Sequence, residues 1–313
     1  MPDAIKWATR FLGGFWLLDG LLQLQPKMFT PMFVGAVLIP TATAQPEPVR
    51  WFLTQGLHLW STMPMLANLG VAMTQIGIGM ALCIPRESWQ RTGLWASIGW
   101  SLFVWTFGEG LGSVLLPGQS LLTGLPGSAL LYAGFSVLIV TYQRNHFTRT
   151  LRRGISVLWA VGAGYQARPL FWKAHFLSEM LRKVAATPSP KWVTSPIYLV
   201  AHWVNHAPVV ANMLLVSIML VMALWTAASR RPTWRMVLAS SVILSTFWWI
   251  GMDFGVLGGV GTDPNTAPLF LMAIVTWYWH DSAEARSSQD ALMFPTSILA
   301  PKAAPAPLQQ KVR

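Results

Sequence analysis

Charged residues are scarce in this chain of 313 residues. They make up 11% of it, whereas hydrophobic residues make up 53% and the mean hydropathy is +0.46. A soluble domain carries about a quarter charged residues, so the composition argues against one. Apolar runs of membrane-spanning length are present, such as 64–84 and 208–228. The sequence therefore predicts an all-α, polytopic membrane helix bundle with the lipid bilayer as its first partner.

Acidic residues are scarcer than basic ones, 11 against 22, which gives a net charge of +11. Such a balance suits a nucleic-acid partner only where the basic side chains gather on one face. Here they stand between the apolar runs, a pattern that orients a protein in a membrane. We therefore expect no nucleic acid as a partner.

Cysteine is limited to Cys83, which lies inside an apolar run. This excludes an intramolecular disulfide, a CxxC pair and a thiolate metal site. The chain also lacks the GxxxxGK[ST], HExxH and GxSxG motifs and the paired histidines of a haem-binding bundle. Nucleotide hydrolysis and covalent haem are therefore not expected.

What the chain does have is an internal repeat at an offset of about 144 residues. The matched pairs include Trp16/Trp159, Gln23/Gln166, Pro26/Pro169, His58/His202, Pro64/Pro208, Asn68/Asn212 and Glu109/Asp253. Apolar matches would mean little in so apolar a chain, but polar residues, proline and Trp in one order indicate two copies of a unit.

About eight spans fit this pattern, four in each copy. The expected ranges are 5–25, 64–84, 93–109, 127–143, 152–168, 208–228, 235–252 and 266–280. We divide the chain into a first four-helix membrane repeat (1–145), a second (146–281) and a disordered cytoplasmic tail (282–313), which is rich in Pro and Ala.

Most basic residues fall on one side of these spans, which the positive-inside rule makes cytoplasmic. We therefore expect a multi-pass protein of the cytoplasmic (inner) membrane with both termini inside. Because each copy has an even number of spans, the copies lie parallel, related by a pseudo-two-fold axis along the membrane normal. The outer segments 27–63 and 170–207 are broken by proline, and we expect surface helices or a cap over the bundle.

Asp19 is the strongest single candidate for a binding-site residue. It lies in an apolar run, and Gln23 follows four residues later on the same helical face. A carboxylate at membrane depth costs about 3 kcal/mol and usually marks a functional interior. The alternative is a structural carboxyl held by Trp or Ser. The second copy has Gly162 at this position, so the role of Asp19 is not duplicated.

His58 and His202 precede an outward helix end in each copy. A neutral imidazole can bind a metal, shuttle protons or donate to a quinone carbonyl, and packing is the alternative. For Asn68 and Asn212, a hydrogen bond between spans is the favoured interpretation over ligand binding.

Glu109 and Asp253 each close a Trp-rich span at the outer surface. They predict either a shared outer site or two solvated carboxylates at helix ends. The run Asp263-Pro264-Asn265 predicts a turn in which Asx side chains bond back to the backbone.

Methionine is frequent, with 15 residues, and Met28, Met32, Met63 and Met65 lie on the outward side near His58. Thioether and imidazole ligands suit Cu(I). No regular array repeats in the second half, however, and methionine in an apolar bundle commonly serves packing. We therefore do not expect copper.

The opening run at 10–23, RFLGGFWLLDGLLQ, and the run IGIGMAL at 76–82 resemble the DoxX/DoxD-like integral membrane family. The resemblance covers about the first 140 residues. It implies a four-helix membrane unit and, from some members, quinone-coupled oxidation of sulfur compounds or a place in membrane redox complexes. It supplies no catalytic residues, and the second half departs from it because its opening helix lacks the Asp.

Three functions remain open. The first is a membrane protein of a redox process, with quinone as its ligand and other redox subunits as partners. The second is a transporter or channel for a small solute or metal ion. The third is a structural or assembly subunit. One cavity shared by Asp19, His58, Glu109, His202 and Asp253 would favour the first two, and scattered positions would favour the third.

Overall fold

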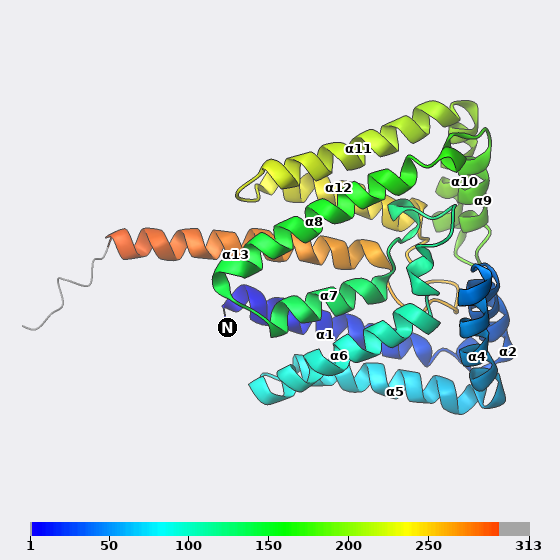
Figure 1. The fold of residues 1–313 in the computed structure, drawn as a ribbon, viewed down its shortest axis with the longest axis horizontal. Coiled ribbons are helices and arrows are strands. Elements are labelled where there is room, and N and C mark those ends of the chain that lie inside the picture. The colour runs from blue at the N-terminus through cyan, green and yellow to red at the C-terminus, as the bar shows by residue number, and fades with distance from the viewer. Residues whose placement is uncertain (1, 294–313) are drawn as a thin grey trace, which may run out of the picture.

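Every regular element in the described part of the chain, residues 2–293, is helical, and no strand occurs among them. The coordinates are a computed structural model. The predicted all-α class is confirmed for these residues. Figure 1 shows long helices running side by side, with shorter helices gathered across one end.

Four long helices form the first half of the bundle. They are α1 (Asp3–Gln23), α5 (Pro64–Cys83), α6 (Glu87–Phe107) and α7 (Ser128–Val140). Helix α1 packs most extensively against α5, and α6 packs against α7.

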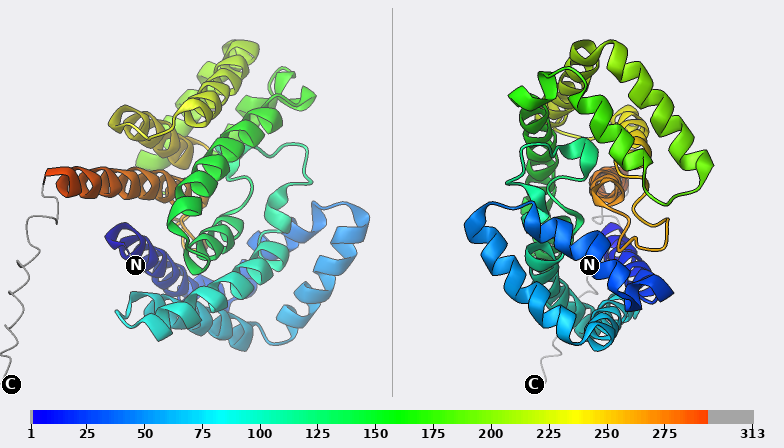
Figure 2. Two further views of the ribbon diagram at one scale, coloured as in Figure 1. Left: turned by 60° about the vertical axis from the view of Figure 1, so that its left-hand side comes forward. Right: turned by 90° about the vertical axis from the view of Figure 1, so that its right-hand side faces the viewer.

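Four further long helices form the second half. They are α8 (Arg144–Gln166), α11 (Pro208–Ala228), α12 (Trp234–Ile250) and α13 (Thr266–Met293). Helix α8 packs against α11, and α12 packs against α13. Helix α13 also contacts α1, α7 and α8, and so joins the two halves. The end-on view in Figure 2 places it near the centre of the bundle.

Shorter helices cap one end of the bundle and run across the direction of the long ones (Figure 1). In the first half these are η1 (Pro26–Phe29), α2 (Pro31–Phe33), η2 (Val34–Leu38), α3 (Ile39–Thr43) and α4 (Glu47–Thr62). In the second half they are η5 (Pro169–Trp172), α9 (Phe176–Ala185) and α10 (Lys191–His206). The segments 27–63 and 170–207 thus form the expected helical caps.

Proline marks several of the helix boundaries. Pro64 and Pro208 are the first residues of α5 and α11, where a missing N–H costs nothing. Pro26 and Pro169 begin η1 and η5, directly beyond the ends of α1 and α8. The expected ranges of the eight long helices therefore differ from the observed ones mainly at their ends.

The largest boundary differences lie at the end of the bundle opposite the caps. Helix α8 begins at Arg144, where the sequence predicted a start at 152, and α13 continues to Met293, beyond the expected end at 280. Charged and polar residues are the majority in both extensions, and Ala, Glu and Arg are good helix formers in water. The tail predicted to be disordered from 282 is therefore helical at first, and 294–313 lie outside the described residues.

Two of the described helices, α5 and α11, are long and apolar enough to cross a membrane. Two shorter apolar helices, α7 and α12, accompany them. Only 28% of the apolar window of α11 is buried against the rest of the chain. Large apolar side chains that α11 exposes include Val209, Met213, Leu214, Leu220 and Leu224.

Helices α1 and α5 approach closely because both carry glycine at their contact. A Cβ at Gly79 would lie 2.8 Å from the carbonyl oxygen of Gly13 and 2.7 Å from Cγ of Leu17. Only hydrogen fits there. This contact fixes the position of α1 relative to α5, and so the position of Asp19, which lies on another face of α1 with Trp16 and Gln23.

Candidate functional site

A cavity of about 500 Å³ lies in the first half of the bundle, beneath the cap. Its walls come from α1, α5, α6 and α7, and α4 closes it at the capped end. Small-molecule sites commonly measure about 300–1,000 Å³ and combine an apolar wall with a few polar groups. This cavity has both features.

Aromatic side chains form much of the apolar wall. They are Trp16, Phe33, Trp60, Trp100, Phe103 and Phe107. Because these rings are flat and large, they suit a planar, apolar ligand better than a strongly hydrated one.

Asp19 lies on the buried face of α1 and lines the cavity beside these aromatic side chains. The residue is only 2% exposed. The hydroxyl of Tyr132 on α7 faces the carboxyl. The Tyr132 ring lies against Trp16, with 4.4 Å between the ring centroids. Trp16 is held in turn by a 2.9 Å hydrogen bond from its Nε1 to Ser97 Oγ. The side chains around Asp19 are therefore fixed by packing.

Glu109 reaches the cavity from the loop just beyond the end of α6. Its Oε1 accepts hydrogen bonds from Ser128 Oγ, at 2.6 Å, and from the backbone N–H of Ala129, at 3.0 Å. Both donors belong to the first turn of α7, where a carboxyl group is favoured. A Cβ at Gly127 would collide with Glu109 Oε2, and the φ of +97° at Gly127 also favours glycine.

Burial raises the pKa of Glu109 from 4.5 to about 8, and the nearby negative charge of Asp263 adds to the effect. Hydrogen bonds from Ser128 and Ala129 oppose this rise without cancelling it. At neutral pH the Glu109 carboxyl is therefore mostly protonated, and it can donate as well as accept a hydrogen bond.

Asp263 enters the cavity from the second half of the chain. Its Oδ1 accepts from the backbone N–H of Asn265 at 2.7 Å, and its Oδ2 accepts from Thr262 Oγ1 at 2.9 Å. The predicted Asx turn is thus confirmed. The same loop is tied to η1, just beyond α1, by a hydrogen bond from Lys27 Nζ to the carbonyl oxygen of Gly258.

Polar atoms without a protein partner gather in this cavity. Among the described residues that line it, these atoms are Gln23 Oε1, Trp60 Nε1, Gln75 Oε1, Trp100 Nε1 and Glu109 Oε2, while the Asp19 carboxyl and the Tyr132 hydroxyl have each other as neighbours. An unpaired buried polar group costs about 1–3 kcal/mol. In a cavity of this size, such atoms can bond to water or to a ligand.

The structure brings only some of the predicted site residues together. Asp19, Gln23 and Glu109 line the cavity, whereas His58 and His202 are exposed on α4 and α10. Neither histidine is among the cavity-lining residues.

The other predicted candidates make contacts within the protein. Asn68 donates from Nδ2 to the backbone oxygen of Gln23 at 2.8 Å, and Asn212 accepts from Gln166 Nε2 at 2.8 Å. Asp253 accepts hydrogen bonds from the hydroxyls of Thr187 and Ser189, which tie the α9–α10 connection to the end of α12.

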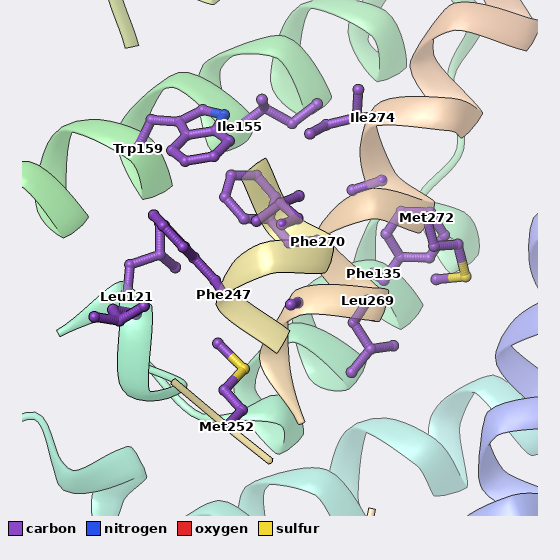
Figure 3. Close-up of a cluster of buried hydrophobic side chains, with 14 of the residues drawn as sticks. Leu121, Phe135, Ile155, Trp159, Phe247, Met252, Leu269, Phe270, Met272 and Ile274 are labelled. Carbon is purple, nitrogen blue, oxygen red and sulfur yellow. The ribbon is translucent and has the colours of Figure 1, made fainter. Parts of the chain in front are cut away.

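The space beside Gly162, the residue that matches Asp19, is filled by side chains. A Cβ at Gly162 would lie 2.9 Å from Cβ of Leu121. Figure 3 shows Leu121 with Trp159 and Phe247 in a cluster of buried apolar residues. The two halves therefore differ at this place: one holds a cavity with a carboxyl, and the other a packed core.

Polar residues of the cavity that were not among the sequence candidates include Gln75, Tyr132 and Asp263. Gln75 had a usable signal, because it follows Asn68 by two helical turns and so shares its face. Tyr132 lies in the apolar run of α7, where one Tyr with its large apolar ring does not stand out from packing residues. Asp263 had no signal of this kind, since its place depends on contacts between the halves.

Within residues 2–293, no group of three or more His, Cys, Asp and Glu side chains stands close enough to hold a metal ion. No protein-family model, no curated protein and no solved structure matches the chain.

Proposed function

We propose that this chain is a multi-pass integral membrane protein made of two parallel four-helix units, related by a pseudo-two-fold axis along the membrane normal. The paired helix contacts support this, since α1 meets α5 as α8 meets α11. The hydrogen bonds between Gln23 and Asn68 and between Gln166 and Asn212 join the same helices of each unit.

The apolar exterior supports a membrane location. In water, the exposed Leu, Val and Met side chains of α11 would form a large apolar patch, which soluble monomers rarely carry. Arg86 lies in the turn between α5 and α6, and Arg230 and Arg231 in the turn between α11 and α12, opposite the caps. By the positive-inside rule this end faces the cytoplasm of the inner membrane, and the caps face outward.

For the first unit, we propose a site that binds the ring of a membrane quinone. The observation that carries this proposal is a group of buried polar side chains inside an aromatic wall, two carboxyl groups and a phenol among them, several of whose atoms have no hydrogen-bond partner. A quinone ring is planar and apolar and bears two carbonyl oxygens that accept hydrogen bonds. Aromatic side chains would sandwich the ring, and the polar groups would fix its orientation.

Each polar group has a defined part in this proposal. The protonated carboxyl of Glu109 donates to one ring oxygen, and Tyr132, beside the Asp19 carboxyl, donates to the other, while Gln23 on α1 adds a further polar group. Quinone and quinol differ by two electrons and two protons. Carboxyl groups beside the ring provide sites from which the protons are taken or to which they are released, and the electrons come from or go to a redox partner subunit. The resemblance of the opening helix to the DoxX/DoxD-like family supports a redox setting with other membrane subunits.

The decisive experiment measures quinone affinity of the purified protein in detergent by titration calorimetry, using a decyl-tailed dimethoxy-methyl-benzoquinone. We expect Asp19→Asn to weaken binding at least about tenfold, which corresponds to about 1.4 kcal/mol. Asp253→Asn is the matched control, because this buried carboxylate bonds to Thr187 and Ser189 away from the cavity. Absence of binding by the wild type, or an equal loss in both variants, would reject the proposal.

A second function is favoured by one specific observation. Three carboxyl groups line the cavity, from Asp19, Glu109 and Asp263, and no Lys, Arg or His is among its lining residues. Carboxylates with aromatic faces also suit an organic cation. A lipophilic amine, offered in the same titration and in proteoliposome uptake, separates the two functions: uptake that Asp19→Asn abolishes, without quinone binding, would establish a transporter.

A further inference from the structure

Helices α5 and α6 are joined by a short turn and separate away from it (Figure 1). Close to the turn they pack tightly, since a Cβ at Gly93 of α6 would lie 3.1 Å from Cβ of Ala81. Towards the capped end, the cavity takes lining residues from both helices, among them Gly70 on α5 and Phe103 on α6. The gap between the two helices is thus widest where the cavity lies.

Residues on the two edges of this gap face both the cavity and the outside of the bundle. Leu66 on α5 and Phe103 on α6 line the cavity, yet they are 64% and 46% exposed. Gly70 also lines it and is exposed, and a Cβ built there meets no atom within 4 Å. The cavity therefore has a side opening at Gly70, bordered by large apolar side chains.

The capped end of the cavity is more closely covered than this side. Helix α4 lies over it, with Gly56 against the ring of Phe107 and with Phe52 and Phe107 5.1 Å apart between ring centroids. The loop with Thr262 and Asp263 covers a further part. A ligand that came from the aqueous side would have to displace these contacts.

The matching positions of the second half carry larger side chains. Leu214 stands on α11 where α5 has Gly70, and Ile218 stands where α5 has Thr74. Both Gly70 and Thr74 line the cavity. The half with the cavity therefore has small side chains at the gap, and the other half has large ones at the matching positions.

We propose that this gap is a lateral portal through which a lipophilic ring compound enters from the outer leaflet of the bilayer. The ring lies among the aromatic side chains of the cavity, and its hydrocarbon tail passes out between α5 and α6, over Gly70, into the lipid. The proposal of a portal rests on the proposed quinone site. It adds that the ligand comes from the bilayer and that it is a ring with a long tail.

The test blocks the portal with Gly70→Phe, which open space at this position accommodates. The control is Gly77→Phe on the same helix: Gly77 is also exposed, meets nothing within 4 Å of a built Cβ, and does not line the cavity. Binding of a decyl-tailed benzoquinone and of its tail-less analogue is followed by stopped-flow quenching of Trp fluorescence in liposomes.

With Gly70→Phe we expect affinity for the tailed quinone to fall about tenfold or more and its association to slow, while affinity for the tail-less ring changes less than about twofold. Gly77→Phe should match the wild type for both compounds. If the wild type binds quinone but Gly70→Phe leaves the association rate of the tailed quinone unchanged, or lowers the affinity for both compounds equally, the portal is overturned. A wild type that binds neither compound would overturn the quinone site itself and the portal with it.

Discussion

The side-chain amide of Asn68 donates a hydrogen bond to the backbone carbonyl oxygen of Gln23, 2.8 Å away. Gln23 is the last residue of α1, where carbonyl groups have no partner within the helix. The bond therefore satisfies a helix end and joins it to α5. It leaves the Gln23 side-chain oxygen, which lines the cavity, unpaired and available to a ligand.

Replacing Asn68 by alanine is expected to destabilise the protein by about 1 kcal/mol, because hydrogen bonds between membrane helices contribute about 0.6 to 2 kcal/mol. Thermal unfolding in detergent measures the effect. Gln55→Ala, on the exposed face of α4, is the control and should leave the melting temperature unchanged. An Asn68→Ala protein as stable as this control would mean that the bond contributes nothing.

Stability should depend on pH through Glu109. Its pKa is about 8 in the folded protein and 4.5 without the protein environment, so between these values the folded state holds a proton that the unfolded state has lost. The unfolding free energy should therefore fall as pH rises from about 4.5 to about 8, and change little from this source outside that window.

Glu109→Gln removes the titrating group and keeps the acceptor for Ser128 and Ala129. Melting temperatures of both proteins, taken at several pH values across the window, should converge at its acid end and diverge towards its alkaline end, with the variant the more stable there. Parallel curves would show that Glu109 titrates normally.

Truncating Leu121 should open a hole in the second half. The residue is 1% exposed and lies beside Gly162, and Leu→Ala changes in cores cost about 2–5 kcal/mol. Leu115→Ala, in the same connection but 47% exposed, should cost far less. Chemical denaturation of the two variants in detergent tests this, and equal losses would contradict a packing role for Leu121.

The proposed orientation predicts which positions react from outside the cell. In a Cys83→Ser background, Gln55→Cys on α4 should be labelled by a membrane-impermeant maleimide on intact cells. Ser88→Cys, near the turn between α5 and α6, should be labelled only after the cells are opened; both positions are exposed on the protein surface. The reverse pattern would invert the topology.

Sequence patterns were informative where the physical cause is local. Apolar run length predicted the long helices, and Pro64 and Pro208 predicted the starts of α5 and α11, because both signals act within a few residues. Asp19 stood out because a carboxylate is rare in such a run. These features could be found without knowing how the helices pack.

Long-range contacts were not predictable in this way. His58 and His202 recur in both copies, yet they lie on exposed faces of α4 and α10, so repetition alone did not mark the cavity. Asp263 is far from Asp19 in sequence, yet both line the cavity, and the loop around Gly258 also bonds to Lys27. Only the packing of one half against the other places such residues.

The position of Leu121 has a consequence for how the chain can be divided. Leu121 precedes the junction at 144 but completes the interior of the second half, while Asp263 follows the junction but completes the cavity of the first. The halves have exchanged parts, so neither is an autonomous module. A C-terminal fragment expressed alone would lack Leu121 in its core, and an N-terminal fragment would lack Asp263 in its cavity. The proposed ligand binding therefore requires both halves together.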